Sequence, residues 1–454
     1  MLIFNRKKMK NIFKIATRYV IVLFLFAFVT TSCSIDEVVD PNGPSVGGVL
    51  ANATVAQLNE LAVGVESTTR NGLGVDVTAS GTMARELYLF DADPRNTGDL
   101  LGKEGITLDN NSFYSTSQWN GSYRCIKNAN ILIDAASNTS TVTDAERNGY
   151  LGFAKTIIAY ELIQILKSYG MARVDVADPN NLGPLLEIGE VLTFVRNLLN
   201  EANTDLSAAG SSFAFSLSSG YDGFNTPTTF AQFNRAISSV AAVYDGDGTT
   251  ALAALNASYF SLSGDLDLGP KYVFGLGGGG DRANPVFRVA SVSAAEPNNG
   301  DQIIVHDSWI NEAEAGDTRV TTKTAVRPDP SIQDGLTGTN ETRLYVSNIS
   351  DIDIIRNEEL ILVYAEASIL ANNLQDAEDA LNVIRNAAGL ADYAGLQNTA
   401  DLTTELLNQR RYSLWSENHR MFDLRRYGLS NTLPIDRAGD QVFNVLPIPL
   451  SENL

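Results

Sequence analysis

Apolar side chains recur at steps of three and four residues through much of the chain, which is the spacing of an α-helix with one buried face. One such face lies within 117–137 and consists of Trp119, Tyr123, Ile126, Ala129 and Ile133. A second helix is predicted over 144–167, because Asp144 can cap its first turn and the apolar period continues behind it. Further helices are predicted over 54–66, 188–209, 228–244 and 250–262.

The helical spacing returns near the C-terminus. Asn357 can cap one helix, a second helix over 375–388 stops at Gly389, and a third spans 402–417. Short turns between such helices predict antiparallel helix pairs. Because no strict repeat of about 34 residues is present, a tetratricopeptide-like scaffold is predicted from the alternation of helices alone.

Between these two helical regions the pattern changes. Glycine becomes frequent at 275–280, prolines interrupt the chain, and short β-rich segments appear, namely PVFRVAS, QIIVH and RLYVS. This composition predicts loops with a few strands. The predicted fold class is therefore mainly α, a tetratricopeptide-like helix-pair scaffold with a loop-rich, partly β middle region. We divide it into an N-terminal helical region at 54–262, a loop-rich region at 263–353 and a C-terminal helical region at 354–454.

The N-terminus has the pattern of a secretory signal followed by a lipid anchor. Residues 1–18 contain six basic residues and no acidic one, and 19–29 form an apolar run too short to span a bilayer. Small residues then precede Cys33, an arrangement similar to a bacterial lipobox, so Cys33 is predicted to carry the lipid. We assign 1–32 to a lipoprotein signal peptide and 33–53, rich in glycine and proline, to a flexible tether.

Charge and composition exclude several classes of function. The formal net charge is −20, and loss of the six basic residues of the signal peptide makes it −26, which argues against a nucleic-acid surface. Two cysteines cannot build a disulfide framework, and two histidines, His306 and His419, leave little for a metal site or a catalytic relay. The GLGGGG run lacks the lysine of a phosphate loop. The DGDGT segment at 245–249 lacks the glycine at position six and the bidentate acid at position twelve of a calcium loop. We expect no cofactor and no metal site.

The most specific segment is QRRYSLWSENHRMFDLRRYG at 409–428, where arginines and acidic residues interleave with large apolar ones. Guanidinium and carboxylate groups that are partly shielded from water can lock a loop to a helix through bidentate hydrogen bonds. The acidic neighbours of these arginines again argue against a nucleic-acid surface.

This segment resembles the C-terminal half of the SusD/RagB family, as do NEELILVYAEASI (357–369), DAEDALNVIRNAAGL (376–390) and LPIPLSEN (446–453). WNGSYRCIKNAN at 119–130, the lipobox and the tether are also similar to that family, whereas 210–350 is not covered. Family members are lipid-anchored outer-membrane glycan-binding proteins of Bacteroidota. The chain departs from the family pattern at Gln409, Ser413 and Asn418.

The resemblance implies a SusD-like fold and a role in nutrient uptake. The protein would be a non-catalytic outer-membrane lipoprotein, facing the cell exterior, that binds an oligo- or polysaccharide and delivers it to a TonB-dependent, SusC-like transporter. Two alternatives stay open: a helical-repeat surface lipoprotein that binds peptide or protein, and a glycoside hydrolase. Carboxylates are plentiful in the sequence, but no spacing singles out a catalytic pair.

A glycan site needs flat rings that stack on sugar C–H groups, and polar groups for the hydroxyls. In 85–99 two aromatic residues alternate along a short extended segment, and polar residues follow around a proline. A tryptophan lies in the loop-rich middle, and Tyr272 and Phe274 precede the glycine-rich run. We predict ligand binding by Tyr88, Phe90, Asp93, Arg95, Asn96, Trp309 and Tyr272. Trp119 and Trp415 lie on helical apolar faces and are assigned to the core.

Overall fold

The computed structural model describes residues 46–178, 180–278, 281–289 and 301–453. The predicted signal peptide, Cys33 and most of the predicted tether lie outside the described residues. The last part of that tether is helical, as α2 (Val46–Asn52). Residues 50–454 form one compact unit. Within the described part of the chain, no helix is both long and apolar enough to cross a membrane.

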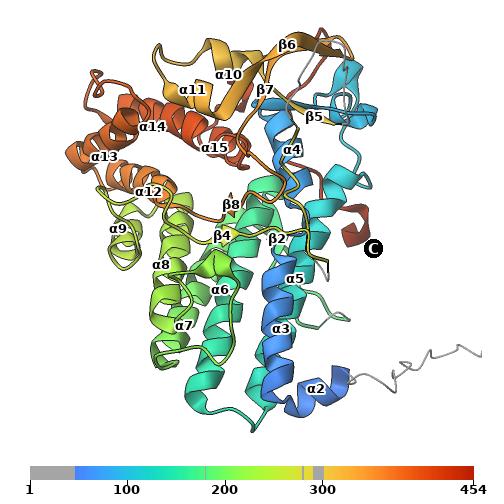
Figure 1. The fold of residues 1–454 in the computed structure, drawn as a ribbon, viewed down its shortest axis with the longest axis vertical. Coiled ribbons are helices and arrows are strands. Elements are labelled where there is room, and N and C mark those ends of the chain that lie inside the picture. Colours follow the sequence, from blue (N-terminus) through green and yellow to red (C-terminus); the bar gives the residue numbers. More distant parts are fainter. Residues whose placement is uncertain (1–45, 179, 279–280, 290–300, 454) are drawn as a thin grey trace, which may run out of the picture. The chain divides into compact units, whose positions relative to one another are not determined.

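Long helices make up the N-terminal half of this unit (Figure 1). They are α3 (Val55–Thr68), α4 (Leu73–Met83), α5 (Phe113–Asn138), α6 (Asp144–Tyr169), α7 (Ile188–Ala208), α8 (Pro227–Tyr244) and α9 (Gly248–Asn256). Helix α6 packs against α5 and α7, and α7 packs against α8. Thr54 and Thr143 begin α3 and α6 with capping boxes, in which the threonine side chain accepts a backbone N–H three residues later. The predicted helices of this half are therefore present, but Thr143 and not Asp144 caps α6, and the helix predicted over 250–262 ends at Asn256.

A mixed set of short elements follows. One sheet has the order β1 (Leu87–Phe90), β5 (Gln302–Val305), β7 (Leu336–Thr342) and β6 (Thr324–Gln333), with all pairs antiparallel. Two small sheets pair β2 (Met171–Arg173) with β3 (Leu185–Glu187) and β4 (Lys271–Tyr272) with β8 (Ile352–Asp353). The short helices α10 (Asp307–Asn311) and α11 (Thr318–Lys323) lie between β5 and β6. Single 3₁₀ turns include η1 (Pro94–Asn96), η2 (Lys103–Gly105) and η3 (Ser219–Tyr221).

The strands differ in part from the prediction. The segment QIIVH forms β5, as predicted, whereas RLYVS at 343–347 and the described part of PVFRVAS form no strand. The β6–β7 hairpin was not predicted, because its strands are rich in threonine and charged residues. Its turn, Asp334-Gly335, has φ of 52° and 78°, the geometry of a two-residue hairpin turn that favours Asp-Gly. The Asp-Gly dipeptide could therefore have indicated this hairpin from the sequence.

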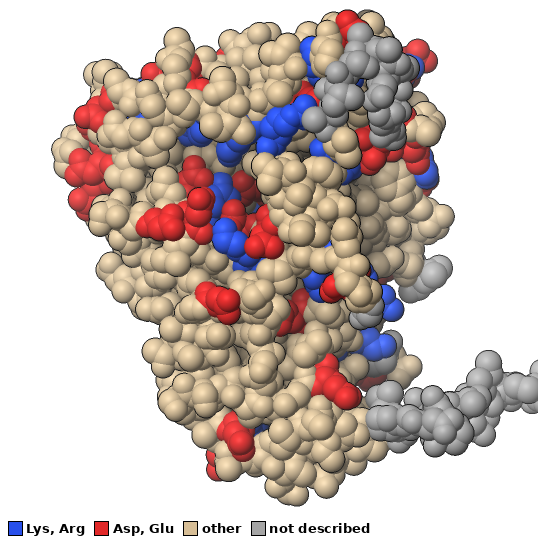
Figure 2. All heavy atoms as spheres, viewed as in Figure 1, with Lys and Arg blue, Asp and Glu red and all other residues tan. Residues whose placement is uncertain are grey.

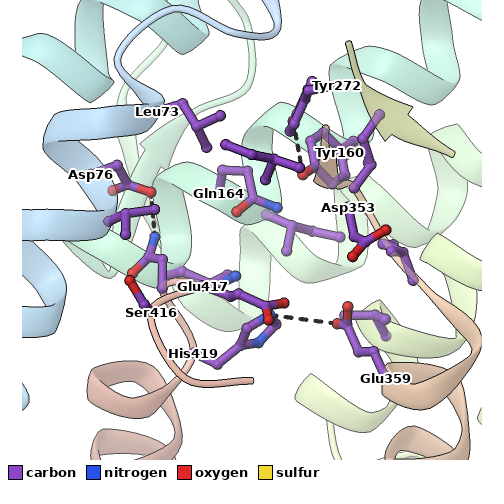
Figure 3. A pocket seen from close by; sticks show the side chains of 18 of the residues that line it. Leu73, Asp76, Tyr160, Gln164, Tyr272, Asp353, Glu359, Ser416, Glu417 and His419 are labelled. Atoms are coloured by element: carbon purple, nitrogen blue, oxygen red, sulfur yellow. Dashed lines mark hydrogen bonds and ion pairs between the residues drawn. The ribbon is translucent and has the colours of Figure 1, made fainter. Parts of the chain in front are cut away.

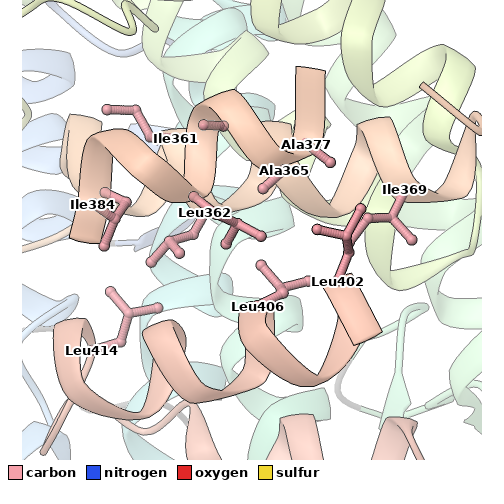
Figure 4. Packing of buried hydrophobic residues seen from close by; sticks show 11 residues of the cluster. Ile361, Leu362, Ala365, Ile369, Ala377, Ile384, Leu402, Leu406 and Leu414 are labelled. Carbon is pink, nitrogen blue, oxygen red and sulfur yellow. The ribbon is translucent and has the colours of Figure 1, made fainter. Parts of the chain in front are cut away.

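The C-terminal half contains α12 (Asn357–Leu370), α13 (Leu374–Ala387), α14 (Thr399–Ser413) and α15 (Arg420–Arg426). The first three enclose a cluster of buried aliphatic residues (Figure 4), whose members include Leu362, Leu381 and Leu406. Helix α12 is buried nearly all round, because α8 and α9 cover one side and α13 and α14 cover another. Asn357, expected to cap α12, is instead its first residue, and its side-chain oxygen accepts the Ser261 N–H at 2.9 Å.

Candidate functional site

The two aromatic residues predicted in 85–99 lie in the core of the sheet. Tyr88 and Phe90, on β1, are 5% and 1% exposed, and their rings stack with centroids 5.5 Å apart. They pack with Leu101, Ile304 and Leu336 in one buried cluster. The strand is buried on both faces, so the alternation of its side chains brings neither ring to the surface. Neither ring can stack on a sugar unless it moves out of this cluster.

The polar residues of the same segment are partly accessible. The Asp93 carboxylate accepts hydrogen bonds from Arg95 Nε at 2.9 Å and Nη2 at 2.6 Å, and these bonds lower the pKa of Asp93. The Arg95 guanidinium lies over the Phe113 ring, 4.8 Å from its centroid. Asn96 is buried and donates to Asp91 Oδ2 at 2.8 Å. Asp93 and Arg95 therefore form a solvent-facing pair that rests on an aromatic ring.

Trp309 lies on α10 and is 0% exposed. Its ring packs between Tyr412 and Trp415, with centroid distances of 5.0 and 5.1 Å, and its indole N–H donates to the carbonyl oxygen of Arg411 at 3.2 Å. The residues that cover it are about a hundred positions later in the chain, which the local sequence could not indicate. Trp119 and Trp415, assigned to the core, are buried.

Tyr272, the remaining predicted residue, lies between two hollows. It forms part of β4 and is 6% exposed, and its hydroxyl group is 3.0 Å from that of Tyr160. Its ring lines both a small cavity and a larger surface groove. Of the predicted ring residues, Tyr272 is thus the one placed at the wall of a described hollow.

The small cavity has a volume of about 50 Å³ and lies where α4, α6, α8, β8, α12 and the turn at 416–419 meet (Figure 3). Its charged and polar lining includes Asp76, Lys167, Asp353, Glu359, Glu417, Asn418 and His419. A hollow of this size holds a few water molecules and is far below the roughly 300 Å³ of a small-molecule site. The cavity is therefore a small polar pocket with no room for a sugar ring.

Burial shifts the titration of the cavity residues. It raises the pKa of Asp76 to about 6, although the carboxylate accepts hydrogen bonds from Ser168 Oγ at 2.6 Å and Asn418 Nδ2 at 2.5 Å. Burial also raises the pKa of Glu359 to about 7 against the attraction of Lys167. The pKa of His419, 3.8 Å from the Glu359 carboxylate, is held well below its usual range by burial and nearby cations, so its imidazole is neutral at pH 7.

Ion pairs of the motif at 409–428 connect α12, α14, α15 and the turn at 416–419 beside this cavity. Arg410 Nε donates to Asp423 Oδ2 at 2.7 Å, and Arg426 donates to Asp423 at 2.8 Å and to Glu366 at 2.6 Å. Arg356 Nη1 donates to Glu417 Oε2 at 2.6 Å, which ties the turn to the start of α12. These pairs are largely buried. The predicted locking of loop to helix by guanidinium–carboxylate pairs is thus confirmed.

The surface groove, which we call the β4 groove, has a volume of about 300 Å³. It is lined by the C-terminal part of α3, the segment 216–221 and β4, with Val63, Glu66, Ser67, Thr69, Arg70, Ser216, Leu217, Ser218, Tyr221, Lys271, Tyr272 and Val273. Within 216–221, Gly220 lies so close to β4 that an added Cβ would be 2.1 Å from the Lys271 carbonyl oxygen. A glycine is therefore required where 216–221 approaches β4.

Polar groups of the groove are oriented by local contacts. Glu66 accepts the Ser218 N–H at 3.1 Å, Arg70 Nη1 donates to the Val273 carbonyl at 2.6 Å, and Lys271 Nζ donates to Asp353 at 2.7 Å. Acidic and basic side chains also gather around a hollow near the middle of the face seen in Figure 2. The sequence alone did not predict these groove residues, because they come from three segments far apart in the chain and belong to no local motif.

Comparison with known proteins agrees with this architecture. The model of the SusD family matches residues 332–445. The structure is similar to surface glycan-binding protein A from Bacteroides thetaiotaomicron, with a TM-score of 0.67 and 16% identity over 89% of this chain and 97% of that one. It is also similar to B. fragilis NanU, with a TM-score of 0.63 and 18% identity over 91% and 97% of the two chains. No curated protein matches the chain in sequence.

A SusD superfamily protein from Parabacteroides distasonis shows the same likeness, with a TM-score of 0.64 and 17% identity over 88% of this chain and 96% of that one. At such identities the likeness defines the fold, which is the mainly helical, tetratricopeptide-like SusD fold predicted from the sequence. The sequence match to the SusD family over 332–445 lies within the C-terminal part of this same fold.

Proposed function

We propose that the protein is a cell-surface lipoprotein that binds an oligo- or polysaccharide and delivers it, uncleaved, to a TonB-dependent outer-membrane transporter. The observation that supports this most is the SusD fold, shared along almost the whole chain with structures described as surface glycan-binding protein A from Bacteroides uniformis and B. thetaiotaomicron. The chain covers 97% of each of those structures.

We place the saccharide in the β4 groove. Its volume of about 300 Å³ is at the lower end of known small-molecule sites, whereas the cavity is about 50 Å³. Val63, Leu217 and Val273 offer apolar surface for the C–H face of a sugar. Arg70 and Lys271 donate hydrogen bonds and Glu66 accepts them, which suits sugar hydroxyls. Asp93 and Arg95, beside Phe113, are a second proposed contact region.

The proposed lack of catalysis rests on where the carboxylates lie. Glycoside hydrolysis requires two carboxyl groups on either side of the bond that is cleaved. Among the described residues that line the β4 groove, Glu66 is the single carboxylate. Two carboxylates whose pKa is raised, Asp76 and Glu359, face a cavity too small for a sugar ring.

The anchor and the partner are also part of the proposal. Lipidation of Cys33 would hold the body at the outer membrane, and the SusC-like transporter would be its partner. Replacement of Cys33 by serine should move the protein from the membrane fraction to the soluble one. Purification of the lipidated protein in mild detergent should recover a TonB-dependent transporter, and its absence from every preparation would count against delivery.

Affinity gels containing neutral polysaccharides test the glycan site. The non-lipidated Cys33→Ser protein should be retarded by at least one of them, and the double variant Arg70→Ala/Lys271→Ala should be retarded much less. Arg124→Ala, at an exposed position of α5, is the control for charge. Retention of an extended peptide but of no glycan would favour the protein-binding alternative, and release of short saccharides would reveal a hydrolase.

A further inference from the structure

A second groove lies on α14 and α15, apart from the residues discussed so far as a saccharide site. Its volume is about 520 Å³, within the range of ligand sites. Its lining consists of Ala400, Thr403, Thr404, Leu407, Asn408, Arg411, Arg420, Leu424, Tyr427, Leu429 and Thr432. Two arginines thus face one hollow that is also lined by hydroxyl, amide and aliphatic groups. We call it the arginine groove.

The two arginines differ in their partners. Arg411 donates to Glu312 Oε2 at 2.5 Å and to Ser308 Oγ at 3.1 Å, so its guanidinium is held in place. Arg420 is only partly exposed, yet within the described part of the chain its guanidinium makes no hydrogen bond and no ion pair. No Arg420 nitrogen is among the enclosed unpaired atoms of the described chain, so these donors are open to a ligand in the groove.

The acidic residues near Arg420 leave it without an available counter-charge. Burial raises the pKa of Glu86 to about 8, so this carboxyl is protonated at neutral pH. Asp423 is engaged by Arg410 and Arg426, and the exposed Glu312 is paired with Arg411. Burial and the neighbouring Arg411 lower the pKa of Arg420 to about 10, which still leaves it positively charged at pH 7.

We propose that the arginine groove binds a carboxylate-bearing sugar, with the carboxylate on Arg420 and beside Arg411. A guanidinium binds a carboxylate through two parallel hydrogen bonds. Thr403, Thr404 and Asn408 would meet the sugar hydroxyls, and Leu407, Leu424 and Leu429 would contact its C–H face. The site is distinct from the β4 groove, so it adds an acidic class of ligand to the proposed function and does not depend on it.

Isothermal titration with glucuronate, glucose and inorganic sulfate tests this site in the non-lipidated protein. Glucuronate should bind saturably, and glucose and sulfate should bind at least tenfold more weakly. Arg420→Gln should lower the affinity for glucuronate at least tenfold, whereas Arg124→Gln, which removes the same charge from an exposed position, should leave it unchanged. Equal binding of sulfate or of glucose would overturn the assignment to an acidic sugar.

Thermal unfolding provides a second measurement that does not depend on one variant. Glucuronate should raise the Tm of the wild type and of Arg124→Gln but not of Arg420→Gln. If Arg420→Gln does not fold, Asn408→Ala replaces it, because that side chain is partly exposed in the groove. An unchanged glucuronate affinity in the folded variant would overturn the proposal. Because Arg70→Ala/Lys271→Ala reports on neutral glycans separately, the two sites can fail independently.

Discussion

The ring of Tyr272 lines both the cavity and the β4 groove. Charged side chains such as Asp76 and Glu359 are buried in the cavity, whereas in the groove they are partly exposed to solvent. In the cavity, burial raises the pKa of Asp76 and Glu359, so their ionisation is coupled to folding. In the groove, Glu66, Arg70 and Lys271 are partly exposed to solvent, and one local contact orients each of them. The same residue types are thus buried and coupled to folding in the cavity, and partly exposed to solvent in the groove.

The largest difference should appear when a buried ion pair beneath the cavity is broken. Asp423→Ala leaves Arg410 and Arg426 without their shared carboxylate, so we expect a loss of about 3–5 kcal/mol in the free energy of unfolding. Urea unfolding measures it. Asp144→Ala removes a carboxylate that is 95% exposed and should cost no more than about 1 kcal/mol. Equal losses would remove the distinction between the two settings.

The same comparison extends to aromatic rings. Trp309→Ala should lower the free energy of unfolding by about 3–5 kcal/mol, because it empties a fully buried site between Tyr412 and Trp415. Calorimetry measures the effect of this substitution on stability, and an affinity gel measures its effect on glycan retention. A variant with an unchanged Tm and weakened glycan retention would show that Trp309 is a binding residue, as predicted from the sequence.

The pH dependence of stability should sharpen the contrast further. The pKa of Glu359 is about 7 in the folded protein and 4.5 in a model compound, so its contribution to stability is greatest below pH 4.5 and is lost as the pH rises to 7. Glu359→Gln lacks this loss. Between pH 4.5 and 8 the wild type should therefore lose about 3 kcal/mol more than the variant. Glu60→Gln, at an exposed position, should follow the wild type.

The smallest effect on stability is expected in the groove itself. Lys271→Ala should change the free energy of unfolding by less than about 1 kcal/mol, because its pair with Asp353 is partly exposed to solvent. Its effect on glycan retention should be larger than that of Asp144→Ala. A Lys271→Ala protein that unfolds much more easily than the wild type would show that the groove, like the cavity, is structural.

Much of the fold was predictable because it depends on local signals. The apolar period of α5 and α6 and the arginine-rich motif at 409–428 are visible in a few tens of residues. Burial of individual rings was not predictable, because it depends on distant segments. Trp309 resembles a loop residue until Tyr412 and Trp415 cover it. Strand β1 is an edge strand of its sheet, yet its side chains are buried on both faces.

The groove residues show the same limit. Arg70, Ser218 and Lys271 come from three regions of the chain, and each has an ordinary neighbourhood in the sequence. Only Tyr272 was predicted by its type and its position beside the glycine-rich run. Asp93 and Arg95 were predicted as a polar turn and are indeed partly exposed, but whether they contact a ligand remains a prediction.

Helix α12 makes the two halves of the body depend on each other. Since α8 and α9 cover one flank and α13 and α14 cover another, neither half can bury its own apolar surface once this helix is missing. Heating should therefore melt the body in a single cooperative step. A fragment truncated before Asn357 would expose the aliphatic flanks of α8 and α9, and we expect it to aggregate instead of surviving as a smaller binding module.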